Sequence, residues 1–324
     1  MKIGEPTLDQ LRIFLAVEEE GSFGAAAKRM GRAVSAISYG IAQMEAQLGV
    51  TLFAREGSRK PVLTDDGRGL LGEAKAIIDR SDALLAKTRG LHAGLESDLG
   101  MVVDVMVPGE VIADVLREFR TMFPTVSLNL QVEGLGAVAA CLLDEQSHLA
   151  IGGPVIADNP EFERQAIGTV ELVPVAAPDH LLAREGVKPG ESREHLQLIL
   201  TDRSPLTKGR EFSVLSPLGW RLGDLGAKHA LLKQGIGWGN MPRPMVAADL
   251  ASGALVELDL PEKPGASYTF SALWRRDSKL GPAASWMIDG FRDRLEQCRH
   301  HPGHAHTETD RLDGAAQSPL LPVA

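Results

Sequence analysis

The side chains best suited to contact another molecule lie between Gly24 and Lys60, where small residues are interspersed with basic and polar ones. The acids of this segment are only Glu45 and Glu56, whereas its basic residues are Lys28, Arg29, Arg32, Arg55, Arg59 and Lys60. Guanidinium and ammonium groups contact phosphates, and hydroxyl and amide groups can hydrogen bond to the edges of bases. The segment therefore predicts a local surface for nucleic acid.

Three helices are predicted to position these side chains. The first follows Thr7 and stops at Gly21, and the second follows Ser22 and stops at Gly31. The third begins at Ser35, and small residues in the second helix allow the two to pack closely. One face of the third helix is apolar, with Ile37, Ile41, Met44 and Leu48 at helical spacing.

This pair of helices predicts a helix-turn-helix, in which the second helix enters the major groove of DNA. The candidates for base contacts lie on its polar face and are Ser35, Ala36, Ser38, Tyr39 and Gln43. The candidates for phosphate contacts are Arg32, Arg55, Arg59 and Lys60. The last two lie in a basic turn between two predicted short strands, 51–54 and 61–63, and Arg59 or Lys60 is alternatively a candidate for the minor groove.

A long helix is predicted from Asp65 to about His92. Its seam is spaced alternately by four and three residues, which is typical of a coiled coil, and consists of Leu70, Ala74, Ile77, Ser81, Leu84, Thr88, Leu91 and Leu95. A helix of this length spans roughly 40 Å at about 1.5 Å per residue, too far for the small N-terminal domain to cover its apolar side. We therefore expect it to pair with a second copy.

Beyond the segment GLESDLG, buried-strand patterns alternate with helices, which predicts an α/β domain of two similar lobes with a cleft between them. We divide the chain into a winged helix-turn-helix domain (1–64), a linker helix (65–95), an effector-binding domain (96–298) and a disordered tail (299–324). Ligands of such folds bind where strands end and helices begin. The candidate positions are Val107, Pro108, Gly109, Glu110, Gly152, Gly153, Pro154, Thr201, Asp202, Arg203, Trp220, Gly237 and Met241.

Glu110 has two interpretations. At the start of a helix its carboxylate complements the helix dipole. If it pointed into the cleft instead, it would disfavour an anionic effector and suit a cationic or neutral one.

Composition narrows the class of protein. The chain has 324 residues and a net charge of -9, yet residues 1–93 hold 13 Lys or Arg against 12 Asp or Glu, and the remainder holds 21 against 31. No apolar run approaches the roughly 18 residues of a membrane helix, and no signal peptide is evident, so we expect a cytoplasmic protein. Cys141 and Cys298 lack metal-ligand spacing, and no catalytic motif occurs. We expect neither an enzyme nor a cofactor.

The segments GSFGAAAKRM, SAISYGIAQMEAQLGVTLFAR and LTDDG, between Phe14 and Gly67, resemble the LysR-type transcriptional regulators. The resemblance extends from Leu8 to about Leu295. It implies a DNA-binding regulator with a small-molecule effector, a sensor domain similar to periplasmic binding proteins, and a homodimer that assembles into a homotetramer. The chain departs from the family at Ser35 and Tyr39, where Pro and Arg are common, and at Pro108 to Glu110, which replace the usual hydroxyl residue.

Two alternatives remain open. The chain could be an α/β solute-binding or enzymatic protein whose first 90 residues serve only for assembly. It could also be a DNA-binding protein whose sensor domain has no ligand.

Overall fold

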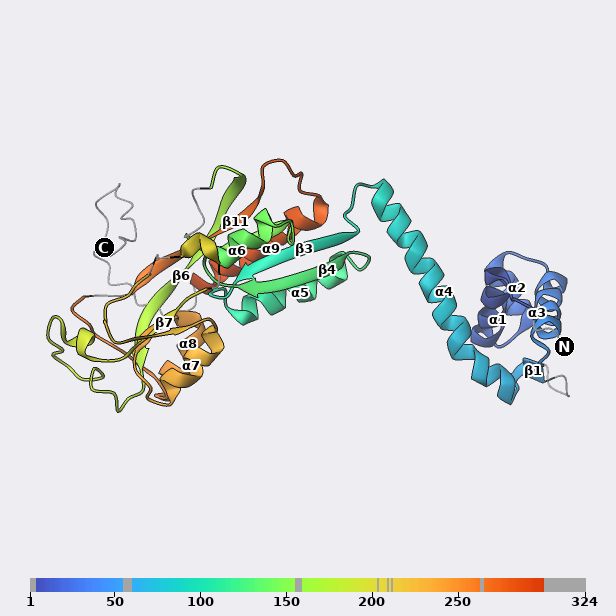
Figure 1. Cartoon of the computed structure of the whole chain (residues 1–324). Helices are drawn as coiled ribbons and strands as arrows, with labels where there is room; N and C mark the ends of the chain where they lie inside the picture. The colour runs from blue at the N-terminus through green and yellow to red at the C-terminus, as the bar shows by residue number, and fades with distance from the viewer. Residues whose placement is uncertain are drawn as a thin grey trace. The chain divides into compact units, whose positions relative to one another are not determined.

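The computed structural model describes residues 4–54, 60–154, 159–202, 204–208, 210, 212–262 and 265–299 (Figure 1). Contacts divide the chain into two units, residues 1–92 and 93–324. The predictions made for Arg55, Arg59 and Arg203, and for residues 300–324 of the tail, lie outside the described residues.

The first unit begins with three helices, α1 (Leu8–Glu20), α2 (Phe23–Met30) and α3 (Val34–Leu48). Thr7 forms a capping box at the start of α1, and the Ser22 hydroxyl accepts a hydrogen bond from the amide of Ala25 at 3.0 Å. Each helix ends at a glycine with a left-handed backbone. The third helix starts one residue before the predicted Ser35, because the carbonyl of Ala33 already accepts from the amide of Ile37.

Close packing joins α2 and α3 to α1. Ala26 and Ala27 of α2 are buried, as are Ile37, Ile41 and Met44 of α3, which confirms the predicted apolar face. A methyl group built on Gly40 would lie 2.6 Å from Cδ1 of Ile13. Only glycine therefore lets α3 come this close to α1 without displacing that side chain.

A two-stranded antiparallel sheet, β1 (Phe53–Ala54) and β2 (Val62–Leu63), follows α3 and confirms the two predicted short strands. The long helix α4 spans Asp65–His92, as predicted. Its first half packs on the three helices through the buried side chains of Ala74 and Ile78.

The second unit is built on a sheet whose strands pair in the order β10-β6-β11-β5-β3-β4, with β9 also paired to β6. Parallel pairing joins β3 (Asp98–Asp104) to β4 (Ser127–Glu133) and to β5 (Leu149–Gly152). Antiparallel pairing joins β6 (Phe162–Ala176) to β9 (Gly239–Pro242), β10 (Val256–Glu257) and β11 (Ala266–Arg275).

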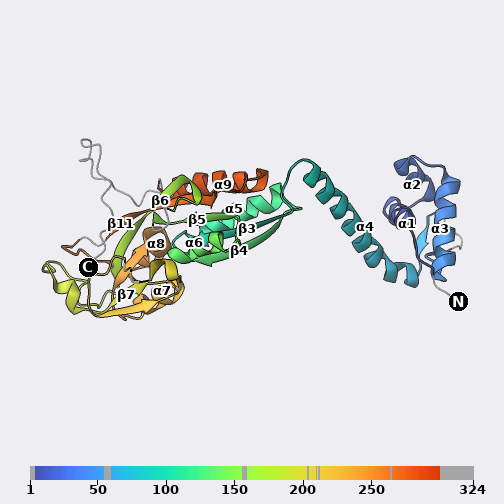
Figure 2. The same ribbon diagram turned by 45° about the horizontal axis from the view of Figure 1, so that its top comes forward.

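Helices cover both faces of this sheet. Met101 and Val103 of β3 belong to the core formed with α5 (Gly109–Met122) and α9 (Pro282–Arg299). Val102 points the other way and packs with α6 (Gly136–Leu143), so that α9 and α6 lie on opposite sides of β3 and β5 (Figure 2).

A second group of elements follows β6 in the chain. It comprises the parallel pair β7 (Gln197–Leu200) and β8 (Gly219–Leu222), and the helices α7 (Leu225–Lys233) and α8 (Arg243–Ser252). Both β6 and β11 run from the β3, β4 and β5 half of the unit to this second half, and their pairing changes register between Phe270 and Ser271. These two strands join the halves.

None of the helices in the described part of the chain is both long enough and apolar enough to span a membrane.

Candidate functional site

The polar face of α3 is open to solvent along its whole length. Its exposed side chains include the five residues predicted for base contacts, Ser35, Ala36, Ser38, Tyr39 and Gln43. The Tyr39 side chain is 66% exposed, and its phenolic oxygen accepts a hydrogen bond from Nε2 of Gln43 at 2.9 Å. Because the opposite face is buried in the core, the packing of the unit fixes the direction in which this polar face points.

Basic side chains lie at the edge of this face, but acids of the same unit hold two of them. Arg32 donates two hydrogen bonds of 2.7 Å to the carboxylate of Asp9, and these bonds lower the pKa of that carboxyl. Arg29 donates to Glu19 and to Glu20. The pairs are exposed, so a phosphate group can replace the carboxylate at little cost. Lys60, beside the wing strands, is also exposed.

The second half of α4 exposes apolar side chains that the rest of its unit does not cover. Leu84 is 66% exposed, and the same side of the helix exposes Ile77 and Leu91, two members of the predicted seam. Leu85 is exposed beside them. Exposed leucines at this spacing are typical of a helix that packs against another helix.

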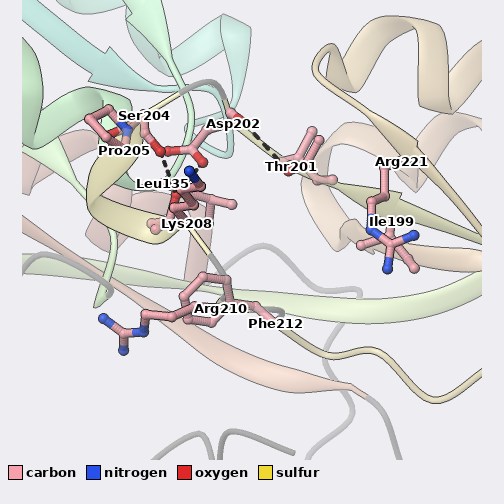
Figure 3. A pocket seen from close by; sticks show the side chains of 12 residues that line it. Leu135, Ile199, Thr201, Asp202, Ser204, Pro205, Lys208, Arg210, Phe212 and Arg221 are labelled. Carbon is pink, nitrogen blue, oxygen red and sulfur yellow. Dashed lines mark hydrogen bonds between the residues drawn. The ribbon is translucent and has the colours of Figure 1, made fainter.

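The second unit contains a cavity of about 530 Å³ between the loop at Leu135, the end of β7, the short helix Pro205–Thr207 and β8 (Figure 3). Two of the predicted effector positions, Thr201 and Asp202, line it. Figure 3 shows three cationic side chains around the same space, namely Lys208, Arg210 and Arg221. These cations were not among the predicted effector positions, because they come from separate segments that have no common motif.

A smaller inner cavity of about 60 Å³ lies next to the outer one and shares four lining residues with it, Leu135, Ile199, Leu200 and Phe212. Its lining includes two buried polar side chains that the sequence analysis also missed, Lys228 of α7 and Tyr268 of β11. Lys228 is 3% exposed. Burial lowers the pKa of its ammonium group to about 7.

Tyr268 belongs to a buried polar cluster around Asp104, the last residue of β3. The Asp104 carboxylate accepts hydrogen bonds from Oη of Tyr268 at 2.8 Å, from the amide of Met106 at 2.9 Å and from the amide of Gly153 at 3.2 Å. Burial raises the pKa of Asp104 to about 6, although these hydrogen bonds oppose the shift. The sequence feature that could have indicated this cluster is an aspartate inside the apolar run MVVDVMV.

The other predicted effector positions in the described part of the chain do not line these two cavities. Val107 and Pro108 are buried, whereas Gly109 and Glu110 are exposed in the first turn of α5.

The rest of this set is dispersed over the second unit. Gly152 ends β5 and precedes Gly153 and Pro154, while Gly237 stands two residues before β9 with a φ of 77°. Trp220 is 52% exposed on β8, and Met241 is buried in the core on β9.

Metal-ligating side chains are not clustered in the described residues, where no group of three or more His, Cys, Asp or Glu could hold an ion. Cys141 and Cys298 are both free thiols.

Comparisons with known proteins match both units. The profile of the bacterial regulatory helix-turn-helix protein, lysR family, matches residues 8–68, and that of the LysR substrate binding domain matches residues 92–296. The chain is 30% identical over 289 residues to the probable HTH-type transcriptional regulator YhaJ of Escherichia coli K12, which covers 87% of this chain and 94% of that protein.

Two further proteins are similar over most of their length. HTH-type transcriptional regulator AceR of Acinetobacter baumannii is 28% identical over 307 residues, or 89% of this chain and 97% of that one. Among solved structures, the Corynebacterium glutamicum OxyR C206 mutant has the same fold, with a TM-score of 0.53 and 20% identity over 92% of this chain and 95% of that one.

Proposed function

The chain belongs to the LysR family of transcriptional regulators, and from this premise we propose how its residues contact DNA and an effector. The chain is a DNA-binding regulator with an effector-binding domain, and its curated relatives are named as transcriptional regulators or activators, not as enzymes. This favours regulation over the alternative of a solute-binding or enzymatic protein.

We propose that α3 is the recognition helix, and the observation that carries this proposal is its fully exposed polar face over a buried apolar one. Ser35, Ser38, Tyr39 and Gln43 contact base edges, and the small Ala36 side chain lets the helix enter the major groove deeply. Arg32 and Lys60 contact phosphates, as do Arg55 and Arg59.

We propose that two chains pair through α4, because its exposed leucines need a partner and one recognition helix alone buries little surface on DNA. The two half-sites then lie about 34 Å apart, or a multiple of that distance. The family resemblance extends this to a dimer of dimers. We retain the domain boundaries after residues 64, 95 and 298, and we propose that the protein works in the cytoplasm, where its DNA lies.

We propose that the effector binds in the two adjoining cavities, where Thr201 and Asp202 contact it. A ligand can shift the balance between two arrangements of the protein only by binding one of them more tightly. Since β11, which joins both halves of the second unit, lines the inner cavity, occupancy of that cavity favours one arrangement of the halves. We infer that this changes the spacing of the DNA-binding units in the assembled regulator.

A test of the dimer uses the double variant Leu84→Asp, Leu91→Asp in the full-length chain. Two buried carboxylates at a helix interface should convert the dimer to a monomer and weaken specific DNA binding at least 100-fold. Sedimentation and DNA footprinting measure the two effects. The matched control, Ala76→Asp with Ala83→Asp, places the same charges seven residues apart on exposed positions of α4 and should stay dimeric. A dimeric Leu84, Leu91 double variant with unchanged footprints would refute the proposed interface.

A further inference from the structure

Among the residues that the structure describes, Lys228 is a buried amine without a charged partner. Within the described part of the chain its ammonium group donates one hydrogen bond, to the backbone carbonyl of Asn240 at 2.7 Å, and forms no salt bridge with a carboxylate. An ammonium group carries three donors. Two of them therefore remain for another acceptor.

Packing of the side chain does not by itself account for a charged group at this position. An ammonium group buried without an anion costs free energy, and an apolar side chain of the same length would fill the same space without that cost. Lys228 is not sealed in the core, however, since it lines the inner cavity together with Tyr268. A ligand that enters this cavity can supply the missing negative charge.

The outer cavity also favours a negatively charged ligand. Among the described residues that line it, three are cationic, Lys208, Arg210 and Arg221, and one is acidic, Asp202. The carboxylate of Asp202 already accepts hydrogen bonds from the amide of Ala137 at 2.9 Å and from the hydroxyl of Thr207. This cationic lining lies in the part of the chain where acids outnumber bases by 31 to 21. Such a site attracts anions locally, whatever the net charge of the protein.

The sizes of the two cavities suit different parts of one molecule. About 60 Å³ beside Lys228 accommodates a head group, and about 530 Å³ outside accommodates a larger body. Leu135, Ile199, Leu200 and Phe212 line both cavities, so that the surface where the two adjoin is apolar.

We propose that the effector is a small organic acid whose carboxylate pairs with Lys228 in the inner cavity. A second acidic group of the same molecule lies in the outer cavity near Lys208, Arg210 and Arg221. The inference rests on the proposed function of the cavities and names the chemical class of their ligand. Glu110, which would have favoured a cationic effector had it faced this space, is exposed and lines neither cavity.

The test measures binding of simple acids to the full-length chain by calorimetry and by thermal shift. Acetate probes the inner cavity alone, succinate probes both cavities, and acetamide and succinamide are their neutral counterparts. We expect saturable binding of both acids, tighter for succinate, and at least tenfold weaker binding of the amides. If neither acid binds saturably, or if an amide binds as well as its acid, the proposal is wrong.

Two substitutions of Lys228 test whether its amine binds the acid or only stabilises the fold. Lys228→Met should weaken binding of both acids at least tenfold without lowering the melting temperature, because a buried amine is replaced by an apolar side chain. Lys228→Gln, which keeps a donor for the Asn240 carbonyl, should show the same loss. The matched control is Lys233→Met on the same helix, which removes a partly exposed lysine paired with Asp249 at 2.7 Å and should change affinity less than twofold. Equal acid binding by wild type and Lys228→Met would overturn the proposal.

Footprinting of the same samples distinguishes this inference from the function on which it rests. Specific DNA binding without any acid binding would refute the organic acid and leave the regulator intact. If the wild type formed no specific DNA complex, the proposed function would itself be wrong.

Discussion

The first unit exposes the side chains proposed to contact DNA, whereas the second unit buries two charged side chains, Lys228 beside the inner cavity and Asp104, which accepts a hydrogen bond from Tyr268 of that cavity's lining. Ser38 and Tyr39 point to solvent from a helix whose other face forms the core. Asp104 and Lys228 are each less than 4% exposed and are held by hydrogen bonds to the backbone. A substitution on the exposed face of the first unit is therefore expected to alter binding alone, whereas ionisation of the buried Asp104 in the second unit is expected to alter stability.

The largest expected difference between the units is in the pH dependence of stability, and it comes from the titration of Asp104. Its pKa of about 6 in the folded protein exceeds the model-peptide value of 3.8, so between these values the folded chain keeps a proton that the unfolded chain has lost. Stability should therefore decrease as pH rises from about 4 to 6 and level off above that, by about 3 kcal/mol for a shift of about two units.

Urea unfolding of wild type and Asp104→Asn across this pH range measures the effect, because other titrating groups cancel in the difference. The variant should lack this component of the pH dependence. If the free energies of unfolding of the two proteins changed in parallel with pH, Asp104 would not titrate in this range. The contrast with the exposed face of α3 would then not hold.

A smaller effect is expected from overpacking in the first unit. Gly40→Leu should destabilise this unit by about 2 kcal/mol, because α3 lies too close to Ile13 to accept a side chain. Gly72→Leu is the matched control, since an added Cβ on α4 meets no atom within 4 Å. Thermal unfolding measures both. If Gly40→Leu were as stable as the control, the close approach would not be a requirement of the fold.

A substitution on the exposed face of α3 should change DNA binding without changing the stability of the fold. Tyr39→Ala should weaken specific DNA binding at least tenfold, about 1.4 kcal/mol, and change the stability of the fold by less than about 0.5 kcal/mol. Ala46→Ser, exposed near the end of α3, should alter neither property. Footprinting and thermal unfolding measure the two properties, and a parallel loss of both in Tyr39→Ala would contradict the separation.

The smallest effect is expected from Arg32. Removing one phosphate contact with Arg32→Ala should weaken all DNA sequences about equally, by a few fold, and reduce the salt dependence by about one counterion. Mobility shifts at several salt concentrations measure this slope. A change confined to certain sequences would place Arg32 at a base instead of a phosphate.

The same contrast explains what the sequence could predict. The helices of the first unit follow from local signals, namely the caps at Thr7 and Ser22, the glycines that end each helix, and the spacing of Ile37, Ile41 and Met44. Because a single helix carries all the residues proposed to contact bases, its period alone predicts which residues are exposed.

The cavities of the second unit could not be predicted in this way. Lys228 lies in an ordinary helical segment and acquires its environment only when β9 packs against α7. The first half of β6 shows no simple alternation of buried and exposed residues, because exposed polar residues and Gly168 interrupt its pattern. Thr201 and Asp202 were found because they follow a clear strand. Their cationic neighbours come together only through tertiary contacts.

The continuity of β6 and β11 limits how the sensor can respond. Two hydrogen-bonded strands pass through both halves, and the hydrogen bonds between them restrict how one half can move relative to the other. We expect the halves to move by bending or twisting of these two strands, and the register change after Phe270 is a place where the pair can bend. The effect of a ligand would then be to favour one curvature of the pair.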